Sequence, residues 1–161
     1  MQFRATAKQM ESLLSPIPTF WDGKRSVLEM KNAGYTQWRQ TEWMGWYFQY
    51  LCAKHLPMMK VPGPKYGNAE FDGFFKIPWD FKAHAMNTSS HQLIVNDSQA
   101  MSKGIAEYGF VGLILAMGKV EYNDEERAFQ QWHTVLKGGM SDYERERIKT
   151  RRVVKVTQGI F

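Results

Sequence analysis

The feature that most constrains the fold is a nearly continuous apolar run over residues 110–120, Phe-Val-Gly-Leu-Ile-Leu-Ala-Met-Gly-Lys-Val. Its length and its β-branched residues are typical of a strand that is buried on both faces at the centre of a sheet. Hydrophobic residues make up 43% of the chain and aromatic residues 14%, which favours a packed globular fold over disorder. The sequence therefore predicts an α/β fold class with a central mixed β-sheet flanked by helices.

The second strong signal is a helix expected over residues 36–56. Thr36 can cap its N-terminus, no proline interrupts it before Pro57, and aromatic side chains crowd it. Further helices are expected over residues 1–15, 26–32, 99–108 and 124–137. Strands are expected in the two apolar runs that flank a Lys76-Ile77-Pro78 turn, at residues 91–95 and in the apolar run described above.

The elements between residues 35 and 137 follow one another as helix, three strands, helix, strand and helix. We expect a single domain over residues 1–161, with this region as its core. Residues 1–34 are expected to form an N-terminal helical extension. Residues 141–161 are expected to form a basic tail, in which residues 153–160 can add a strand.

Charged residues interrupt the two apolar runs around the predicted turn. Asp72 lies in the first run, and Asp80 and Lys82 lie in the second. Side chains alternate along a strand, so Asp80 and Lys82 point to one side and Phe81 to the other. Charges are rarely placed in a half-buried strand unless they are paired or used. Two carboxylates and a lysine at a sheet edge suit phosphodiester hydrolysis assisted by Mg²⁺.

These residues resemble the motif of the PD-(D/E)XK nuclease superfamily, which includes type II restriction endonucleases. The motif has an acidic residue at the start of one strand and (D/E)-X-K on the next, which Asp72 and Asp80-Phe81-Lys82 match. Phe71 stands where the motif has proline. The expected succession of elements also matches the αβββαβ core of that superfamily. The resemblance implies a Mg²⁺-dependent endonuclease that cuts double-stranded DNA and leaves 5′-phosphate and 3′-hydroxyl ends.

The resemblance also implies a role for each residue. Asp72 and Asp80 would bind the metal, the Phe81 backbone carbonyl would add a ligand, and Lys82 would position or activate the attacking water. Glu42, the acidic residue of the helix expected before the first catalytic strand, would complete the catalytic site. The ordinary alternative for Glu42 is a first-turn residue that the helix dipole favours. A palindromic target would imply a homodimer in which each subunit cuts one strand.

Contacts to DNA are expected around this site and from the tail. A loop rich in Pro and Gly over residues 57–68 leads into the predicted hairpin, and the tail carries Lys and Arg residues that can contact phosphates. The candidates are Lys65, Tyr66, Asn68, His84, Arg151 and Arg152. A solvated connector, a structural histidine and a charge-laced helix are the ordinary alternatives for the loop, His84 and the tail.

Composition bounds the remaining possibilities. The formal net charge of +5 fits a polyanionic partner, and Cys52, the only cysteine, excludes an intramolecular disulfide and a thiolate zinc site. No phosphate-binding loop motif is present, so no nucleotide cofactor is expected. No apolar run reaches the roughly 18 residues of a membrane-spanning helix, and the N-terminus lacks the apolar core of a signal peptide. We therefore expect a cytoplasmic protein without a membrane partner.

Several interpretations of the charged trio stay open. A type II restriction enzyme should cut a fixed site in duplex DNA, whereas a repair, recombination or structure-specific nuclease of the same fold should follow DNA structure. A non-catalytic DNA-binding protein would keep its function without Asp80. An unrelated α/β protein would use Asp80 and Lys82 as a buried salt bridge, and losing Asp80 would then destabilise the fold.

Overall fold

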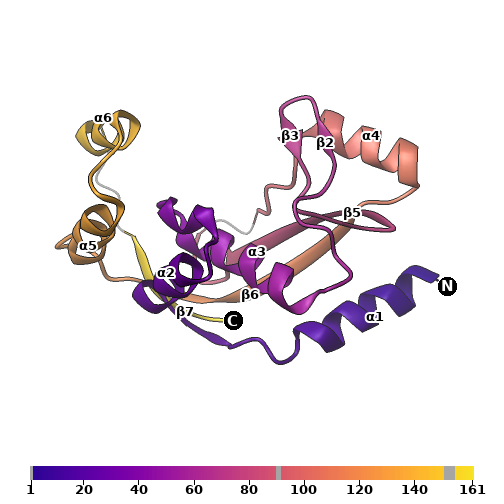
Figure 1. Cartoon of the computed structure of the whole chain (residues 1–161), viewed down its shortest axis with the longest axis horizontal. Coiled ribbons are helices and arrows are strands. Elements are labelled where there is room, and N and C mark those ends of the chain that lie inside the picture. Colours follow the sequence, from indigo (N-terminus) through magenta and orange to yellow (C-terminus); the bar gives the residue numbers. More distant parts are fainter. Residues whose placement is uncertain (1, 90–91, 151–154) are drawn as a thin grey trace. The chain divides into compact units, whose positions relative to one another are not determined.

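Six α-helices, one 3₁₀-helix and seven strands make up the described part of the computed structural model, which covers residues 2–89, 92–150 and 155–161 (Figure 1). The helices are α1 (Gln2–Leu14), α2 (Gly23–Asn32), the 3₁₀-helix η1 (Thr36–Arg39), α3 (Trp43–His55), α4 (Ser98–Tyr108), α5 (Ala128–Lys137) and α6 (Asp142–Thr150). The strands are β1 (Phe20–Asp22), β2 (Lys65–Tyr66), β3 (Ala69–Glu70), β4 (Gly73–Phe75), β5 (Ile77–Ala85), β6 (Gly112–Tyr122) and β7 (Val156–Ile160). None of these helices combines the length and the apolar character needed to cross a membrane.

Five strands form one sheet in the order β1-β7-β6-β5-β4, and β2 and β3 form a separate antiparallel pair. The pairs β1–β7, β7–β6 and β5–β4 are antiparallel. β5 and β6 advance in the same direction, because Gly112 lies against Trp79 near the start of both strands, whereas Met86 N donates to Gly118 O near their ends. The sheet is therefore mixed and flanked by helices (Figure 1), which confirms the predicted α/β class.

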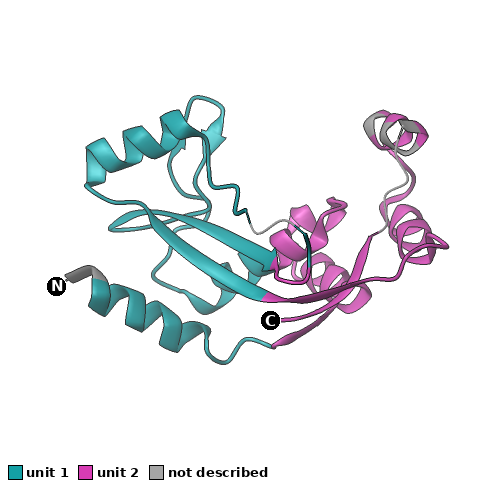
Figure 2. Cartoon of the chain, turned by 180° about the vertical axis from the view of Figure 1, so that it is seen from behind, with its two compact units in different colours: residues 1–18, 48–84, 88–117 teal, residues 19–47, 85–87, 118–161 magenta. Residues whose placement is uncertain are grey.

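Contacts divide the chain into two units, which Figure 2 colours separately. The first unit comprises residues 1–18, 48–84 and 88–117. The second unit comprises residues 19–47, 85–87 and 118–161. Each unit is thus assembled from segments that are distant in the sequence, and α3, β5 and β6 contribute residues to both.

The apolar run forms strand β6, but only one of its faces is well covered. Leu113, Leu115 and Met117 alternate along one face and are 43%, 40% and 48% exposed, whereas Val120 on the other face is 3% exposed. The prediction of two buried faces is therefore wrong. Hydrogen bonding to β5 and β7 makes β6 a central strand of the sheet, but this does not cover both of its faces.

The third strand expected at residues 91–95 is a further difference. Residues 92–95 have no regular structure, and residues 90–91 lie outside the described part of the chain. Ile94 is 84% exposed, so this apolar segment covers no sheet face. The side chain of Asn96 instead donates a hydrogen bond to the Glu70 carbonyl. The prediction is wrong for the described residues, because a short apolar run becomes a strand only where another strand pairs with it.

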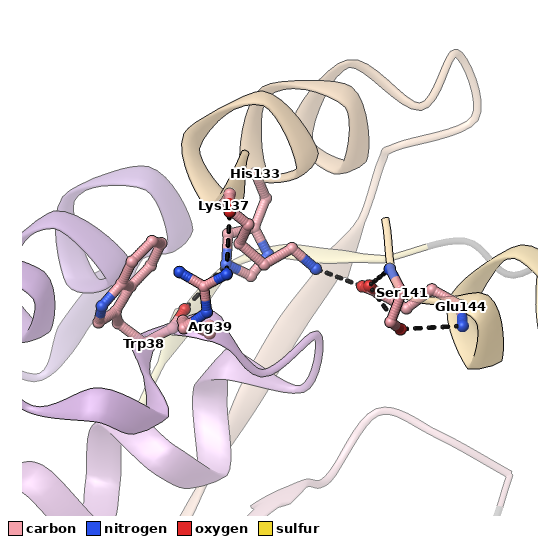
Figure 3. A network of polar contacts seen from close by, with 6 residues as sticks. All are labelled: Trp38, Arg39, His133, Lys137, Ser141 and Glu144. Atoms are coloured by element: carbon pink, nitrogen blue, oxygen red, sulfur yellow. Dashed lines mark hydrogen bonds and ion pairs between the residues drawn. The ribbon is translucent and has the colours of Figure 1, made fainter. Parts of the chain in front are cut away.

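The helix expected over residues 36–56 is interrupted between η1 and α3. Contacts within the second unit hold this break (Figure 3). The Trp38 carbonyl accepts a hydrogen bond from His133 Nε2 at 2.8 Å, and Arg39 Nη2 donates to the Lys137 carbonyl at 2.9 Å. No side chain caps η1, so the expected N-cap is also wrong. Tertiary hydrogen bonds outweigh the helical propensity of this segment.

The network in Figure 3 continues from α5 to the start of α6. Lys137 forms an ion pair with Glu144. Ser141 N donates to Glu144 Oε2 at 3.0 Å, and Glu144 N donates to Ser141 Oγ at 3.2 Å, which is a capping box. The pKa of His133 is lowered, mainly because the ring is buried. The neutral imidazole is therefore favoured, and its Nε2–H donates to the Trp38 carbonyl.

Candidate active site

The β4–β5 hairpin brings the two predicted carboxylates together within the first unit. Asp72 directly precedes β4, and Asp80 and Lys82 lie on β5. Gly73 of β4 pairs with Trp79 of β5, so the hairpin register sets Asp72 beside the segment that carries the other two residues. The expected hairpin and its acidic residues are therefore present, but the turn is shorter than expected, because Ile77 and Pro78 belong to β5.

Apolar side chains anchor this hairpin. Phe71, Trp79 and Phe81 are 0%, 6% and 6% exposed. Because side chains alternate along β5, Trp79 and Phe81 leave on the face opposite to Asp80. Asp80 is nevertheless only 2% exposed, so its charge is buried as well. A buried charge is costly unless nearby groups compensate it, and the contacts of Asp80 are therefore informative.

Both oxygens of Asp72 accept hydrogen bonds, whereas only one oxygen of Asp80 does. Gln49 Nε2 donates to Asp72 Oδ1 at 2.8 Å, and Phe81 N donates to Asp72 Oδ2 at 2.7 Å. Lys82 Nζ lies 3.0 Å from Asp80 Oδ1. Asp80 Oδ2 is buried and has no hydrogen-bond partner among the described residues. Such orphaned polar atoms are rare, and a role in binding a ligand explains them.

The Asp72 carboxyl holds its proton up to near neutral pH. Burial is the largest cause that raises the pKa of Asp72, to about 7, and the neighbouring Asp80 carboxylate raises it further. The Phe81 N–H and the Lys82 ammonium act in the opposite direction. When Asp72 is ionised, the trio of two carboxylates and one ammonium carries a net negative charge, which a cation would offset.

The donor set fits a hard divalent cation such as Mg²⁺. Mg²⁺ is bound in proteins through one or two carboxylates, and it keeps several waters or substrate oxygens as its other ligands. Asp72 and Asp80 supply two carboxylates. Asp80 Oδ2 accepts no hydrogen bond from the described residues, so it can bind a cation. The described residues contain no group of three or more His, Cys, Asp or Glu side chains that could hold a metal. An ion here would therefore complete its shell with water and substrate.

The Phe81 carbonyl and Glu42 have different surroundings. The Phe81 N–H points to Asp72. In a β-strand, the N–H and the C=O of one residue point to the same edge of the strand. The Phe81 carbonyl therefore lies on the Asp72 side of β5. Glu42 is exposed, directly precedes α3 and belongs to the second unit. Its expected place within a helix is therefore wrong, because the helix begins one residue later, at Trp43.

The loop residues predicted to contact DNA cluster on the β2–β3 pair of the first unit. Lys65 and Tyr66 form β2, and Asn68 lies in the turn that leads to β3. Lys65 and Asn68 are exposed, as a contact to phosphate requires. Tyr66 is not a free side chain, because its hydroxyl donates to Glu107 Oε2 at 2.8 Å.

The remaining predicted DNA contacts are His84 and the two arginines of the tail. His84 lies on β5 two residues after Lys82 and is half-buried. It therefore shares the strand face of Asp80 and Lys82, as the alternation predicted. Arg151 and Arg152 lie outside the described residues.

Gln49 is the member of the site that the sequence did not indicate. It lies on α3, is half-buried and contacts Asp72 directly. A signal was nevertheless present, because Gln49 is the one polar residue in the run from Trp46 to Leu51. A polar side chain in a helix stretch that is otherwise aromatic and aliphatic needs a buried partner, and here the partner is a carboxylate.

Comparison of this chain with protein-family models, with curated proteins and with solved structures found no match. The function therefore has to be argued from the arrangement of the residues.

Proposed function

We propose that this chain is a Mg²⁺-dependent DNA endonuclease of the PD-(D/E)XK type, most simply a sequence-specific type II restriction enzyme. The observation that carries the proposal is that Asp72, Asp80 and Lys82 meet at one hairpin, where the buried Asp80 Oδ2 has no hydrogen-bond partner among the described residues. Two adjacent carboxylates and a lysine supply the metal ligands and the positive charge that phosphodiester hydrolysis requires.

Each side chain has a distinct task in this proposal. Asp72 and Asp80 hold the cation through their carboxylate oxygens, with the Phe81 carbonyl as a further ligand. When bound, the cation neutralises charge on the phosphate and lowers the pKa of a water. Lys82, held 3.0 Å from Asp80, orients the attacking water and stabilises the charge that develops on the phosphate.

A purely structural salt bridge explains the contacts less well. A buried ion pair is compensated only when hydrogen bonds satisfy its remaining lone pairs. Asp80 Oδ2 is not satisfied by any described residue, and Asp72 stands beside it as a second buried acid. An arrangement that places two acids together and leaves one oxygen free is costly for the fold alone, and it favours a ligand-binding role.

The proposed partner is double-stranded DNA. The net charge of +5 and the exposed Lys65 and Asn68 on the β2–β3 pair support contacts to phosphates. If the target is a palindrome, two copies of the chain would act as a two-fold homodimer, with one site on each strand. A repair or structure-specific nuclease would use the same site chemistry on branched or single-stranded DNA.

The decisive experiment is a digest of unmethylated phage and plasmid DNA with Mg²⁺ and with EDTA. It compares the wild type with Lys82→Ala and with Lys103→Ala, which removes an exposed lysine of α4 as a matched control. We expect discrete fragments only with Mg²⁺. Lys82→Ala should lower the rate by about 10²-fold or more, because it removes a group that acts on the reacting atoms. Lys103→Ala should cut as the wild type does.

The pattern of products separates the alternatives. A smear would favour a non-specific nuclease, and cleavage of branched or single-stranded DNA alone would favour the structure-specific enzyme. A folded wild type that cuts none of these substrates would overturn the catalytic proposal.

A further inference from the structure

We propose that Gln49 is a positioning residue of this site: its amide fixes the Asp72 carboxylate in the orientation that receives the cation, without adding negative charge. The inference rests on the proposed function, because it concerns the same pair of carboxylates. It adds a residue that lies outside the Asp72, Asp80 and Lys82 trio and on a different element of the fold.

Two donors hold Asp72 from two sides. The Phe81 N–H comes from the hairpin itself, nine residues along the chain, and binds Oδ2 at 2.7 Å. Gln49 Nε2 comes from α3, 23 residues before Asp72, and binds Oδ1 at 2.8 Å. With one donor, the carboxylate could still turn about its side-chain bonds. With donors from two elements, its plane and both of its oxygens are fixed relative to Asp80.

The helix that carries Gln49 is itself well anchored at this point. Its neighbours Phe48 and Leu51 are 2% and 1% exposed. A donor on a packed helix turn can hold a carboxylate more accurately than a donor on a loop. The half-buried Gln49 therefore acts on Asp72 from a rigid support.

The neutral amide matters as much as its position. An acid at residue 49 would place a third negative charge beside the carboxylates of Asp72 and Asp80. A donated N–H has the opposite effect, because a hydrogen bond to an ionised carboxylate stabilises the charged form. The neutral amide of Gln49 therefore holds the Asp72 carboxylate without placing a charge of the same sign beside it.

The test uses Gln49→Leu, which removes the donor, and the near-isosteric Gln49→Glu, which replaces it by an acid. Gln9→Leu makes the same chemical change on the exposed face of α1 and serves as the control. The first measurement is a metal-free carbon-13 NMR titration of the aspartate carboxyls, with Asp72→Asn used to assign the signal. The second is the Mg²⁺ concentration that half-saturates DNA cleavage, measured at several pH values.

We expect the Asp72 titration midpoint to rise by about one pH unit in Gln49→Leu, the shift that corresponds to losing one hydrogen bond to a charged group. The half-saturating Mg²⁺ concentration should rise by about 10-fold, as for the loss of other partners that orient metal ligands. Gln49→Glu should raise the Asp72 midpoint further, because it adds a charge of the same sign, and Gln9→Leu should shift neither quantity.

An unchanged midpoint and unchanged Mg²⁺ dependence in folded Gln49→Leu would overturn the inference. So would a rate that falls by the same factor at every pH and Mg²⁺ concentration, because that pattern indicates packing alone. The titration needs neither metal nor DNA, so it decides the role of Gln49 even if the wild type proves unable to cut DNA.

Discussion

At the scale of single residues, Lys76 has a backbone conformation that its side chain does not favour. Phe75 pairs with Ile77, so Lys76 alone makes the turn between β4 and β5, with a φ of 63°. This left-handed region suits glycine and costs other residues about 1 kcal/mol. The Lys76 ammonium lies 5.2 Å from the centre of the Phe75 ring, and this cation–π contact offsets part of the cost.

The effect of a substitution at Lys76 on stability should therefore depend more on the backbone preference of the new residue than on its charge. Lys76→Gly should leave the free energy of unfolding unchanged or raise it by up to about 1 kcal/mol, whereas Lys76→Val should lower it by about 1–2 kcal/mol, because β-branched residues tolerate this region least. Urea unfolding of the two variants measures the difference. Equal stability of the glycine and valine variants would contradict this explanation of the turn.

At the scale of elements, β5 and β6 approach each other closely where Gly112 meets Trp79. A Cβ atom on Gly112 would overlap the Trp79 indole ring. That ring is only 6% exposed, so it has little room to move away. Its Nε1 also donates to the Phe75 carbonyl at 3.2 Å, which ties it to the end of β4. The glycine is thus required by packing at the start of β6.

Gly112→Ala should lower the free energy of unfolding by about 2–3 kcal/mol, the usual cost of overpacking a buried site. Gly45→Ala is the matched control. Gly45 lies within α3 with no atom close to an added Cβ, so alanine should stabilise the protein by about 0.5–1 kcal/mol there. Chemical denaturation of both variants checks the opposite signs. A Gly112→Ala protein as stable as the wild type would mean that β6 can move away from β5.

At the scale of the whole molecule, Asp72 makes stability depend on pH. The folded pKa of Asp72 is raised to about 7, above its ordinary value of 3.8, mainly because the group is buried. The folded state therefore holds a proton that the unfolded state releases. The resulting stabilisation is complete below pH 3.8, declines as the pH rises, and is lost above about pH 7.

The stability of the wild type relative to Asp72→Asn should thus fall between pH 4 and pH 8, by at least about 1 kcal/mol, since each unit of pKa shift is worth about 1.4 kcal/mol. The difference between the two proteins cancels the contributions of titrating groups that do not interact with Asp72. Thermal or urea unfolding across this range measures it.

Mg²⁺ should recover part of the lost stability at pH 8 in the wild type and much less in Asp72→Asn, because a ligand that binds only the folded state stabilises it. A difference that stays constant with pH would show that Asp72 does not titrate as its surroundings imply.

Features with local signals were predictable from the sequence. Helix α4 was expected at residues 99–108 and spans Ser98–Tyr108. Its Asp97 carboxylate caps the N-terminus, and Gly109 ends it in the left-handed conformation. The β4–β5 hairpin and its charged residues depend on short-range alternation in the same way. That alternation placed Asp80 and Lys82 on one face of β5, whereas the position of Asp72 beside them depends on the register of the hairpin.

Features that depend on distant residues were not predictable. Strand β1 is three residues long and exists because Phe20 pairs with Ile160 near the other end of the chain. The break before α3 is held by residues of α5, as described above. Whether a face of β6 is exposed depends on which other elements pack against it, and the apolar pattern of the strand does not indicate this. Gln49 was missed because its role depends on where α3 lies against the hairpin.

The hydrogen bonds of the candidate site join residues that are close in the sequence, whereas those of the second unit join residues that are far apart. The contacts of the two aspartates span 23, 9 and 2 residues. Those of Trp38, Arg39 and Trp43 in the second unit span 95, 98 and 113 residues. Closing a longer loop costs more entropy, and long-range contacts slow folding. During synthesis, every residue named in the contacts of the two aspartates has been added once Lys82 is in place, whereas the named contacts of the second unit must wait for residues near the end of the chain.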